Sequence, residues 1–294
     1  MIEINDLPKT AAEKKRFVIG SETGYKNRIS DISEAIAKEK PTFLLISGAT
    51  CSGKTTTANI LSRDLKKRGY TAKIISIDDF FLDKDKMISE NIDMESADAL
   101  DMECFYKCIS DISALKKTEL PVFDFVSGQR AAYKSYEPEK DDIIVFEGIQ
   151  ALYPQVTSLF PKNAAKTLFV GFSDDVSVNG TVFGSDEVRF YRRLVRDFKF
   201  RNSSVENTLK IWKNVVRNEN ENILPYFKST DYFINTFFEY ELFVIKDFLL
   251  NKIPYKTPSE TELYEKTAQK FAPLPEIRSS YVPSDSMFRE FIGG

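Results

Sequence analysis

The residues with the clearest chemical pattern lie in one short stretch, Gly48 to Thr55, which reads GATCSGKT and follows an apolar segment that begins at Phe43. This spacing fits G-x-x-x-x-G-K-[ST], in which backbone N–H groups cradle phosphate oxygens and the lysine reaches the outer phosphates. Thr55 is placed to ligate Mg²⁺, and a helix that begins near Lys54 would point the positive end of its dipole at the same anion. An ordinary glycine-containing turn is the alternative, but the strand, the loop and the helix occur in the required order. We therefore predict a nucleotide phosphate site formed by Gly48, Ala49, Cys51, Ser52, Gly53, Lys54, Thr55 and Thr56.

Two acidic residues at predicted strand ends are candidates for chemistry, because parallel α/β sheets gather ligands at the carboxyl ends of their strands. Glu147 follows the apolar run IIVF and can hold Mg²⁺ directly or through water, whereas a solvated carboxylate is the alternative. Asp78 ends the strand that follows the phosphate-loop helix, where it can orient a substrate hydroxyl and accept its proton. Asp79 competes for that role or caps the turn. The sequence thus predicts metal ligands at Thr55 and Glu147 and a catalytic carboxylate at Asp78.

A locally basic segment from Asp186 to Arg201 forms a predicted helix. Its arginines recur at spacings of three and four, which places on one face Arg189, Arg192, Arg193 and Arg196. In one interpretation the helix is solvated and neutralised by its own acidic residues, whose exposed pairs contribute only ~0.3 to 0.5 kcal/mol each. We favour a lid that closes over a triphosphate, because phosphoryl transfer needs cations around a highly charged transition state. Lys54, Arg193 and Arg196 then act with Asp78 in catalysis, and Arg189 binds the nucleotide.

The segment between Ile92 and Tyr136 separates Asp78 from Glu147 in the sequence, where an acceptor-binding insertion would have to lie. Most aromatic residues in such a segment belong to a core, so each one alone favours a structural role. Taken together, the polar and aromatic residues predict an acceptor pocket that contains Asp93, Glu95, Phe123, Phe125 and Arg130, with Arg201 reaching it from the arginine helix.

The elements that position these residues alternate between strands and helices, which argues for a parallel sheet wound by right-handed crossovers. After the strand that opens at Phe43, core strands are predicted over 73–77, 143–146, 167–172 and 232–234. Helices are predicted over 31–38, 99–115, 186–201 and 240–250 and from Lys54 to Gly69, with a loop over 87–96 and a hairpin of 121–125 and 129–136. We therefore expect an α/β P-loop NTPase fold with an inserted β-hairpin and a helical arginine lid. A main domain over 41–253 would carry extensions over 1–40 and 254–294.

Composition excludes several classes of function. The net charge is −3 with both signs interspersed, so no global field favours nucleic acid or an anionic membrane. No apolar run approaches ~18 residues and the N-terminus is polar, so we expect no membrane span, no signal peptide and a cytoplasmic protein. Three cysteines without C-x-x-C suit a reducing compartment. Because histidine is absent, catalysis by a Ser-His-Asp triad or a Cys-His pair is excluded, and a general base must be a carboxylate, lysine or tyrosine.

With these residues in view, the chain resembles the uridine kinase and phosphoribulokinase family of P-loop kinases. The motifs that carry the resemblance are GATCSGKTT, IDDFF, PVFDFVSGQR, VFEGI and RRLVRDFKFRNSS, in the family's order. They span about Phe43 to Asn235, and the chain is most similar to the kinase-like domain of bacterial TGS-linked homologues, although the segment before it is too short for us to expect a TGS domain. The resemblance implies that ATP and Mg²⁺ are used, that Asp78 is catalytic and that Glu147 is associated with magnesium. It also implies phosphate contacts for Arg193 and Arg196, and ribose contacts for Glu95.

The departures from the family pattern fall on the base pocket. Where uridine-cytidine kinases carry a tyrosine and a histidine, this chain has Phe123 and Gly128, and a glutamine and a lid arginine of the family are replaced by Ile211 and Ser203. A site that hydrogen-bonds its substrate can discriminate by ~10⁴ or more, so these losses should relax or redirect specificity.

The resulting hypothesis is ATP-dependent phosphoryl transfer to a hydroxyl of a small metabolite, with a nucleoside favoured. A kinase for a non-nucleoside hydroxyl compound, and a nucleotide switch or degenerate homologue without turnover, stay open. The absence of an N-K-x-D guanine motif disfavours GTPase switches. Neither nucleic acid nor membrane is expected as a partner, while self-association is left open.

Overall fold

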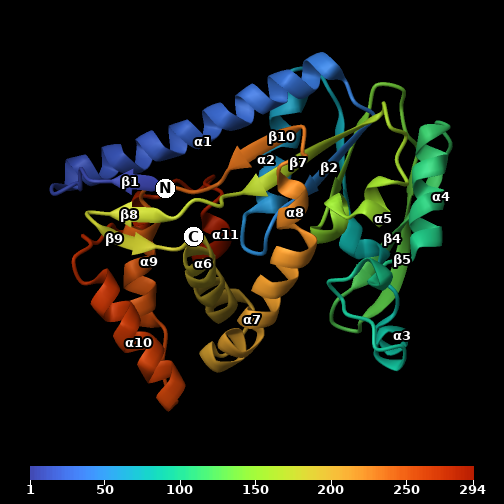
Figure 1. Cartoon of the computed structure of the whole chain (residues 1–294). Helices are drawn as coiled ribbons and strands as arrows, with labels where there is room; N and C mark the ends of the chain where they lie inside the picture. The colour runs from blue at the N-terminus through green and yellow to red at the C-terminus, as the bar shows by residue number, and fades with distance from the viewer.

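The computed structural model describes residues 1–294 and has a five-stranded parallel sheet at its centre (Figure 1). The strands lie in the order β10, β7, β2, β6, β3. Their bounds are β2 (Phe43–Ser47), β3 (Ala72–Ser76), β6 (Ile143–Glu147), β7 (Ala165–Gly171) and β10 (Tyr232–Asn235). All neighbouring pairs run parallel. The predicted α/β fold, with its parallel sheet wound by helices, is confirmed.

The central strands β2 and β6 are buried along their whole length. Alternate residues of a strand point to opposite faces of a sheet, so Leu44 and Ile46 enter one hydrophobic cluster, while Phe43 and Leu45 enter another. The first cluster has 44 buried residues and draws on both ends of the chain; the second has 25 and lies largely under the segment between β3 and β6. Burial on both faces explains why these strands read as continuous apolar runs.

Helices flank the sheet, and α1 crosses the top of the molecule in Figure 1. The helices are α1 (Ala11–Glu39), α2 (Lys54–Lys67), α3 (Lys84–Ser89), α4 (Met102–Ser113), α5 (Pro154–Thr157), α6 (Ser185–Phe200), α7 (Val205–Asn222), α8 (Leu224–Phe227), α9 (Glu241–Asp247), α10 (Pro258–Phe271) and α11 (Arg289–Ile292). Short 3-10 turns occur at Ile77–Phe80, Ala97–Ala99, Ile149–Leu152 and Ser279–Tyr281, and α9 continues as a π-helical turn over Phe248–Lys252. None of the helices is both long and apolar enough to cross a membrane.

The first helix is much longer than the sequence predicted. It begins at Ala11 instead of Asp31, because Thr10 and Glu13 form a reciprocal capping box. Its buried apolar residues are widely spaced, at Val18, Tyr25, Ile29 and Ile36, and they join the larger hydrophobic cluster. This sparse pattern is why periodicity alone detected only the last part of the helix.

The segment between β3 and β6 gathers at one end of the molecule, with α4, β4 and β5 side by side (Figure 1). The predicted hairpin is confirmed as β4 (Thr118–Asp124) and β5 (Gln129–Tyr136). The loop predicted over 87–96 is wrong at its start, because α3 extends to Ser89. The helix predicted from Ala99 begins at Met102, because the Asp101 side chain caps it through the Cys104 N–H.

A second, smaller sheet joins the N-terminus to the middle of the chain. It contains β1 (Ile2–Ile4), β8 (Val176–Val178) and β9 (Thr181–Phe183), in that order. At the other end of the chain, Met287, Phe288, Phe291 and Ile292 are fully buried in the larger cluster. Residues from both predicted extensions therefore pack into the same core as the phosphate-loop strand and helix.

Candidate active site

The phosphate loop connects β2 to α2 and has a backbone that tolerates few side chains. A Cβ on Gly48 would overlap the carbonyl oxygen of Val170 and lie 3.0 Å from its carbon. Gly53 has a φ of 86°, in the left-handed region that favours glycine. Both glycines of the G-x-x-x-x-G-K-T pattern are thus required by the backbone path, independently of any ligand.

The end of this loop offers donors for an anion. Helix α2 begins at Lys54 directly after Gly53, and no side chain caps it. The first N–H groups of a helix lack intrahelical partners, and they combine with the helix dipole to bind phosphate. The Ser52 hydroxyl is buried without a partner, and Lys54 Nζ donates to the Ala49 carbonyl at 3.1 Å across the loop. These groups fit a nucleotide phosphate chain.

The predicted metal ligands lie together. Thr55 Oγ1 donates to Glu147 Oε2 at 3.1 Å, so the helix and the end of β6 place a hydroxyl and a carboxylate side by side. Burial raises the pKa of Glu147, while the nearby Lys54 opposes that shift. No cluster of three or more acidic or cysteine side chains that could hold a metal occurs. The hydroxyl of Thr55 and the carboxylate of Glu147 are oxygen donors of the kind that fits Mg²⁺, which proteins usually bind through one or two oxygens together with substrate phosphates.

Asp78 lies beside this pair. It belongs to the 3-10 turn after β3, and Ser76 at the end of β3 is paired with Glu147. A Cβ on Gly148 would lie 3.5 Å from Asp78 Oδ1, which shows how closely the two strand ends approach. Burial raises the pKa of Asp78, and the positive charge of Lys54 counteracts this. Asp79 instead accepts a hydrogen bond from the Phe123 N–H at 3.1 Å, so its side chain ties the hairpin to the sheet.

The arginine helix α6 lies against the same loop. Arg189 Nη1 donates to the Thr50 carbonyl at 3.3 Å, and Arg193 Nη1 to Thr50 Oγ1 at 3.4 Å. Arg193 and Arg196 also pair with Asp197, at 3.2 and 3.4 Å. The solvated-helix interpretation is wrong for Arg189, whose side chain is only 3% exposed. Several guanidinium groups therefore converge on the phosphate loop, with local carboxylates holding them there.

A model of the Phosphoribulokinase / Uridine kinase family matches residues 43–241. The chain belongs to this family. A uridine kinase from Lactobacillus johnsonii is 28% identical over 182 residues, which cover 61% of this chain and 78% of that protein. A uridine kinase from Saccharomyces cerevisiae is 26% identical over 197 residues, which cover 65% of this chain and 36% of the yeast protein. A solved structure from Silicibacter, described as a candidate fructose transport system kinase, is 17% identical with a TM-score of 0.49, covering 70% of this chain and 98% of its own. That likeness is too weak to bear on function, but the family membership makes this protein a kinase that acts on a small metabolite.

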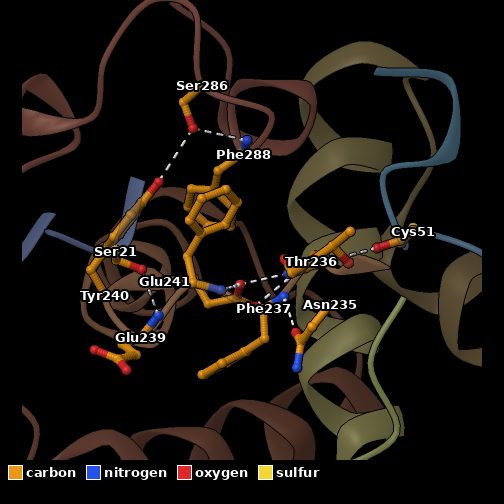
Figure 2. Close-up of polar contacts among 12 residues, drawn as sticks. Ser21, Cys51, Asn235, Thr236, Phe237, Glu239, Tyr240, Glu241, Ser286 and Phe288 are labelled. Atoms are coloured by element: carbon orange, nitrogen blue, oxygen red, sulfur yellow. Dashed lines mark hydrogen bonds and ion pairs between the residues drawn. The ribbon is translucent and has the colours of Figure 1, made fainter. Parts of the chain in front are cut away.

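One of the kinase's four arginines in α6 has a role that the spacing did not indicate. Arg192 is fully buried and forms a two-pronged ion pair with Glu241, at 2.9 and 2.5 Å. Its remaining donors reach the Cys51 carbonyl at 3.1 Å and the Thr236 carbonyl at 2.8 Å. Figure 2 shows the turn that carries Thr236 and Glu241, with Cys51 on one side and Ser286 on another. Arg192 thus connects the phosphate loop to the end of β10 through the protein interior.

The predicted acceptor residues divide into two groups in the kinase. Glu95 lies near Tyr153, whose hydroxyl donates to the Glu95 carbonyl at 3.0 Å, and burial raises the pKa of the Glu95 carboxyl. Phe123 is buried and packs edge-on against Phe125, which is 60% exposed.

The other two predicted acceptor residues are arginines, and they lie away from this group. Arg130 is paired with Asp101 at 3.0 Å and stacks on Tyr133, and it lines a cavity of about 590 Å³ that contains no phosphate-loop residue. Arg201 is exposed and lies 3.8 Å from Asp197. In this conformation neither arginine contacts the phosphate loop.

Sequence reasoning missed two carboxylates that touch the phosphate loop. Glu219 of α7 accepts from the Thr50 N–H at 2.6 Å, and Glu290 of α11 accepts from Thr56 Oγ1 at 2.6 Å. Nearby, Met287 packs against Gly53, its Cγ 3.1 Å from where a Cβ would lie. No local motif marks these residues, because each reaches the loop from a distant part of the sequence.

Proposed function

We propose that the kinase transfers the γ-phosphoryl group of ATP to a hydroxyl of a nucleoside, with Mg²⁺ as the metal. The observation that carries the proposal is the convergence of Thr55, Glu147 and Asp78 beside a phosphate loop, since phosphoryl transfer needs a metal site and an acceptor-orienting carboxylate at that place. The names of the uridine kinase relatives support the nucleoside assignment.

Each residue has a defined part in the proposed reaction. Thr55 and Glu147 would hold Mg²⁺, which when bound neutralises charge on the phosphates. Lys54 would contact the outer phosphates and Arg193 and Arg196 would stabilise the charge that develops during transfer. Asp78 would orient the acceptor hydroxyl, and the raised pKa that burial gives this carboxyl favours its taking up the proton as transfer proceeds.

The surroundings of the proposed base pocket support altered base recognition. Phe123 is buried against Phe81 and Phe125, so the exposed ring of Phe125 presents the aromatic surface here, and neither Phe123 nor Phe125 carries a hydroxyl. Gly128 has a φ of 71°, and a Cβ there would lie 2.8 Å from the Cβ of Lys84, so a larger residue would force the hairpin turn to move. A nucleoside would therefore be recognised mainly by stacking and through its ribose, with Glu95 as the proposed ribose ligand.

The test is ADP release by purified kinase against a panel of nucleosides, sugars and other hydroxyl metabolites. A nucleoside should give release well above the rate with water. If every nucleoside fails while another hydroxyl compound works, the acceptor assignment is wrong. If ATP binds but no acceptor supports turnover, a nucleotide switch or degenerate homologue is the correct description.

Asp78→Asn provides the matched check on the mechanism. It should lower kcat by about 10²- to 10⁴-fold, the usual contribution of a general base, and leave ATP affinity nearly unchanged. Asp79→Asn keeps an acceptor for the Phe123 N–H and should lower kcat much less. The opposite ranking of the two variants would move the catalytic role to Asp79.

A further inference from the structure

The phosphate loop of this kinase is already bonded to an anion that belongs to the protein. Glu219 Oε1 accepts from the Thr50 N–H at 2.6 Å, and Glu219 Oε2 accepts from Arg189 Nη1 at 2.6 Å. The side chains of Arg189 and Glu219 are each only 3% exposed. Between Gly48 and Gly53, Thr50 is the only residue whose backbone N–H donates to a side chain. One carboxylate therefore occupies a loop amide and an arginine at once.

This pair of donors suits a phosphate equally well. Backbone N–H groups of such loops bind phosphate oxygens, and arginine binds carboxylate and phosphate in the same forked geometry. Arg189 is also paired with Asp186 and donates to the Thr50 carbonyl, so it would stay beside the loop if Glu219 withdrew. The donors would then face a ligand oxygen without a large movement of α6.

The position of Glu219 identifies which phosphate would compete with it. Helix α7 continues from Glu219 toward the proposed acceptor site. Asn222, less than one turn further along this helix, lines a cavity together with Ser96 and Tyr153. Both of these residues adjoin Glu95, one in the sequence and the other through its hydrogen bond to the Glu95 carbonyl. Glu290 contacts the other end of the loop, at Thr56 in the first turn of α2. In-line transfer requires the outermost phosphate to face the acceptor. Thr50 is therefore at the γ-phosphate end of the loop.

We propose that the γ-phosphate of ATP displaces the Glu219 carboxylate and takes over the Thr50 N–H and Arg189. This inference rests on the proposed function, because it assumes ATP as the donor. Glu219 is a positioning residue in this scheme: it holds Arg189 ready beside the loop, opposes binding of the triphosphate, and returns once the γ-phosphoryl group has left. ADP lacks that group and does not displace Glu219. Glu219 therefore weakens the binding of ATP but not that of ADP, and so reduces the difference between the two affinities.

The test compares two nucleotides on wild type and Glu219→Gln by calorimetry in the presence of Mg²⁺. The β,γ-imido analogue of ATP should bind the variant about tenfold more tightly, because displacing a neutral amide costs less than displacing a charge-assisted hydrogen bond. ADP affinity should change less than about twofold. Equal tightening of both nucleotides, or none for the analogue, would overturn the proposal.

Glu290→Gln is the matched control, since it also removes one carboxylate charge from the loop. It should shift the affinities of the analogue and ADP together, because its contact with Thr56 lies away from the γ-phosphate end. If Glu219→Gln does not fold, Glu219→Asp keeps a countercharge for Arg189 but retracts it by one methylene, and it should also tighten binding of the analogue relative to ADP. A Glu219→Asp variant with an unchanged ratio of the two affinities would contradict the displacement.

The single tryptophan of the chain gives an independent signal. Trp212 lies on α7, and the Arg189 guanidinium is 5.7 Å from its ring centroid. The analogue should change Trp212 fluorescence in wild type much more than ADP does, because only the analogue displaces the Glu219 carboxylate from the guanidinium that lies beside the indole ring. Identical spectra with the two nucleotides would refute the exchange. Failure of wild type to bind either nucleotide would instead refute the proposed function.

Discussion

Replacing Arg192 by methionine tests whether this arginine serves the interior of the kinase. The change removes the partner of a fully buried carboxylate, Glu241, and leaves two carbonyl groups without a donor. Breaking a buried pair by removing one member costs about 3 to 5 kcal/mol. We expect Arg192→Met to lose that much stability at pH 8, measured by urea unfolding followed by circular dichroism.

The loss should depend on pH in a defined direction. Burial already raises the pKa of Glu241, and Arg192 opposes that shift, so its removal raises the pKa further. Between the unfolded pKa of about 4.3 and this higher folded value, the folded chain binds a proton that the unfolded chain does not. The contribution of Glu241 to the stability of Arg192→Met should therefore be largest below about pH 4.3 and fall by up to about 1.4 kcal/mol per pH unit as the pH rises toward the folded pKa.

The double variant Arg192→Met with Glu241→Gln separates charge from packing. Glutamine keeps an acceptor for the Phe238 N–H, which Glu241 binds at 3.0 Å, but it carries no charge. We expect it to recover part of the loss at pH 8 and to remove the additional pH dependence. A single variant with a loss independent of pH, or a double variant less stable than the single one, would refute this account of the pair.

Two further predictions concern stability. Gly48→Ala should lower the free energy of unfolding by about 1 to 3 kcal/mol, because its Cβ would overlap the Val170 carbonyl. Gly20→Ala, in open space on α1, should raise it by about 0.5 to 1 kcal/mol, as measured by chemical unfolding. Equal changes for the two variants would contradict the steric argument. Burial raises the pKa of Glu22, so this carboxyl should make wild type lose stability as pH rises above about 4.3, and Glu22→Gln, which can still accept from Tyr240, should lose less stability over the same range. Parallel unfolding curves across pH 4 to 7 would contradict the second.

The parts of the site that the sequence predicted obey local rules. A phosphate loop is a contiguous pattern in which the glycines, the lysine and the hydroxyl all have fixed spacing, and Glu147 directly follows a buried strand. The hairpin of β4 and β5 likewise follows from two strand-forming runs around a glycine-containing turn. Parallel topology then brings Asp78 next to Glu147, since adjacent strands end at the same edge of the sheet.

What the sequence did not predict depends on distant contacts or on burial. Spacing placed Arg192 with the other arginines of α6, and only its contact with Glu241 shows that it faces the interior. Glu219 reaches the loop from 169 residues away, which no local pattern records. One local signal was overlooked: Asn179 and Gly180, with φ values of 46° and 83°, form the tight turn between β8 and β9 that an Asn-Gly pair between apolar residues favours.

The contact of α11 with the phosphate loop also has a consequence for synthesis. Thr56 and Glu290 are separated by 234 residues, and Met287 covers Gly53 from the same distant segment. At about 5 to 20 residues per second, the ribosome needs roughly 12 to 47 s to add the residues between them. During that interval the loop lacks the side chains that pack against it. A growing chain therefore cannot complete the packing around its phosphate loop until almost all of these 294 residues have been translated.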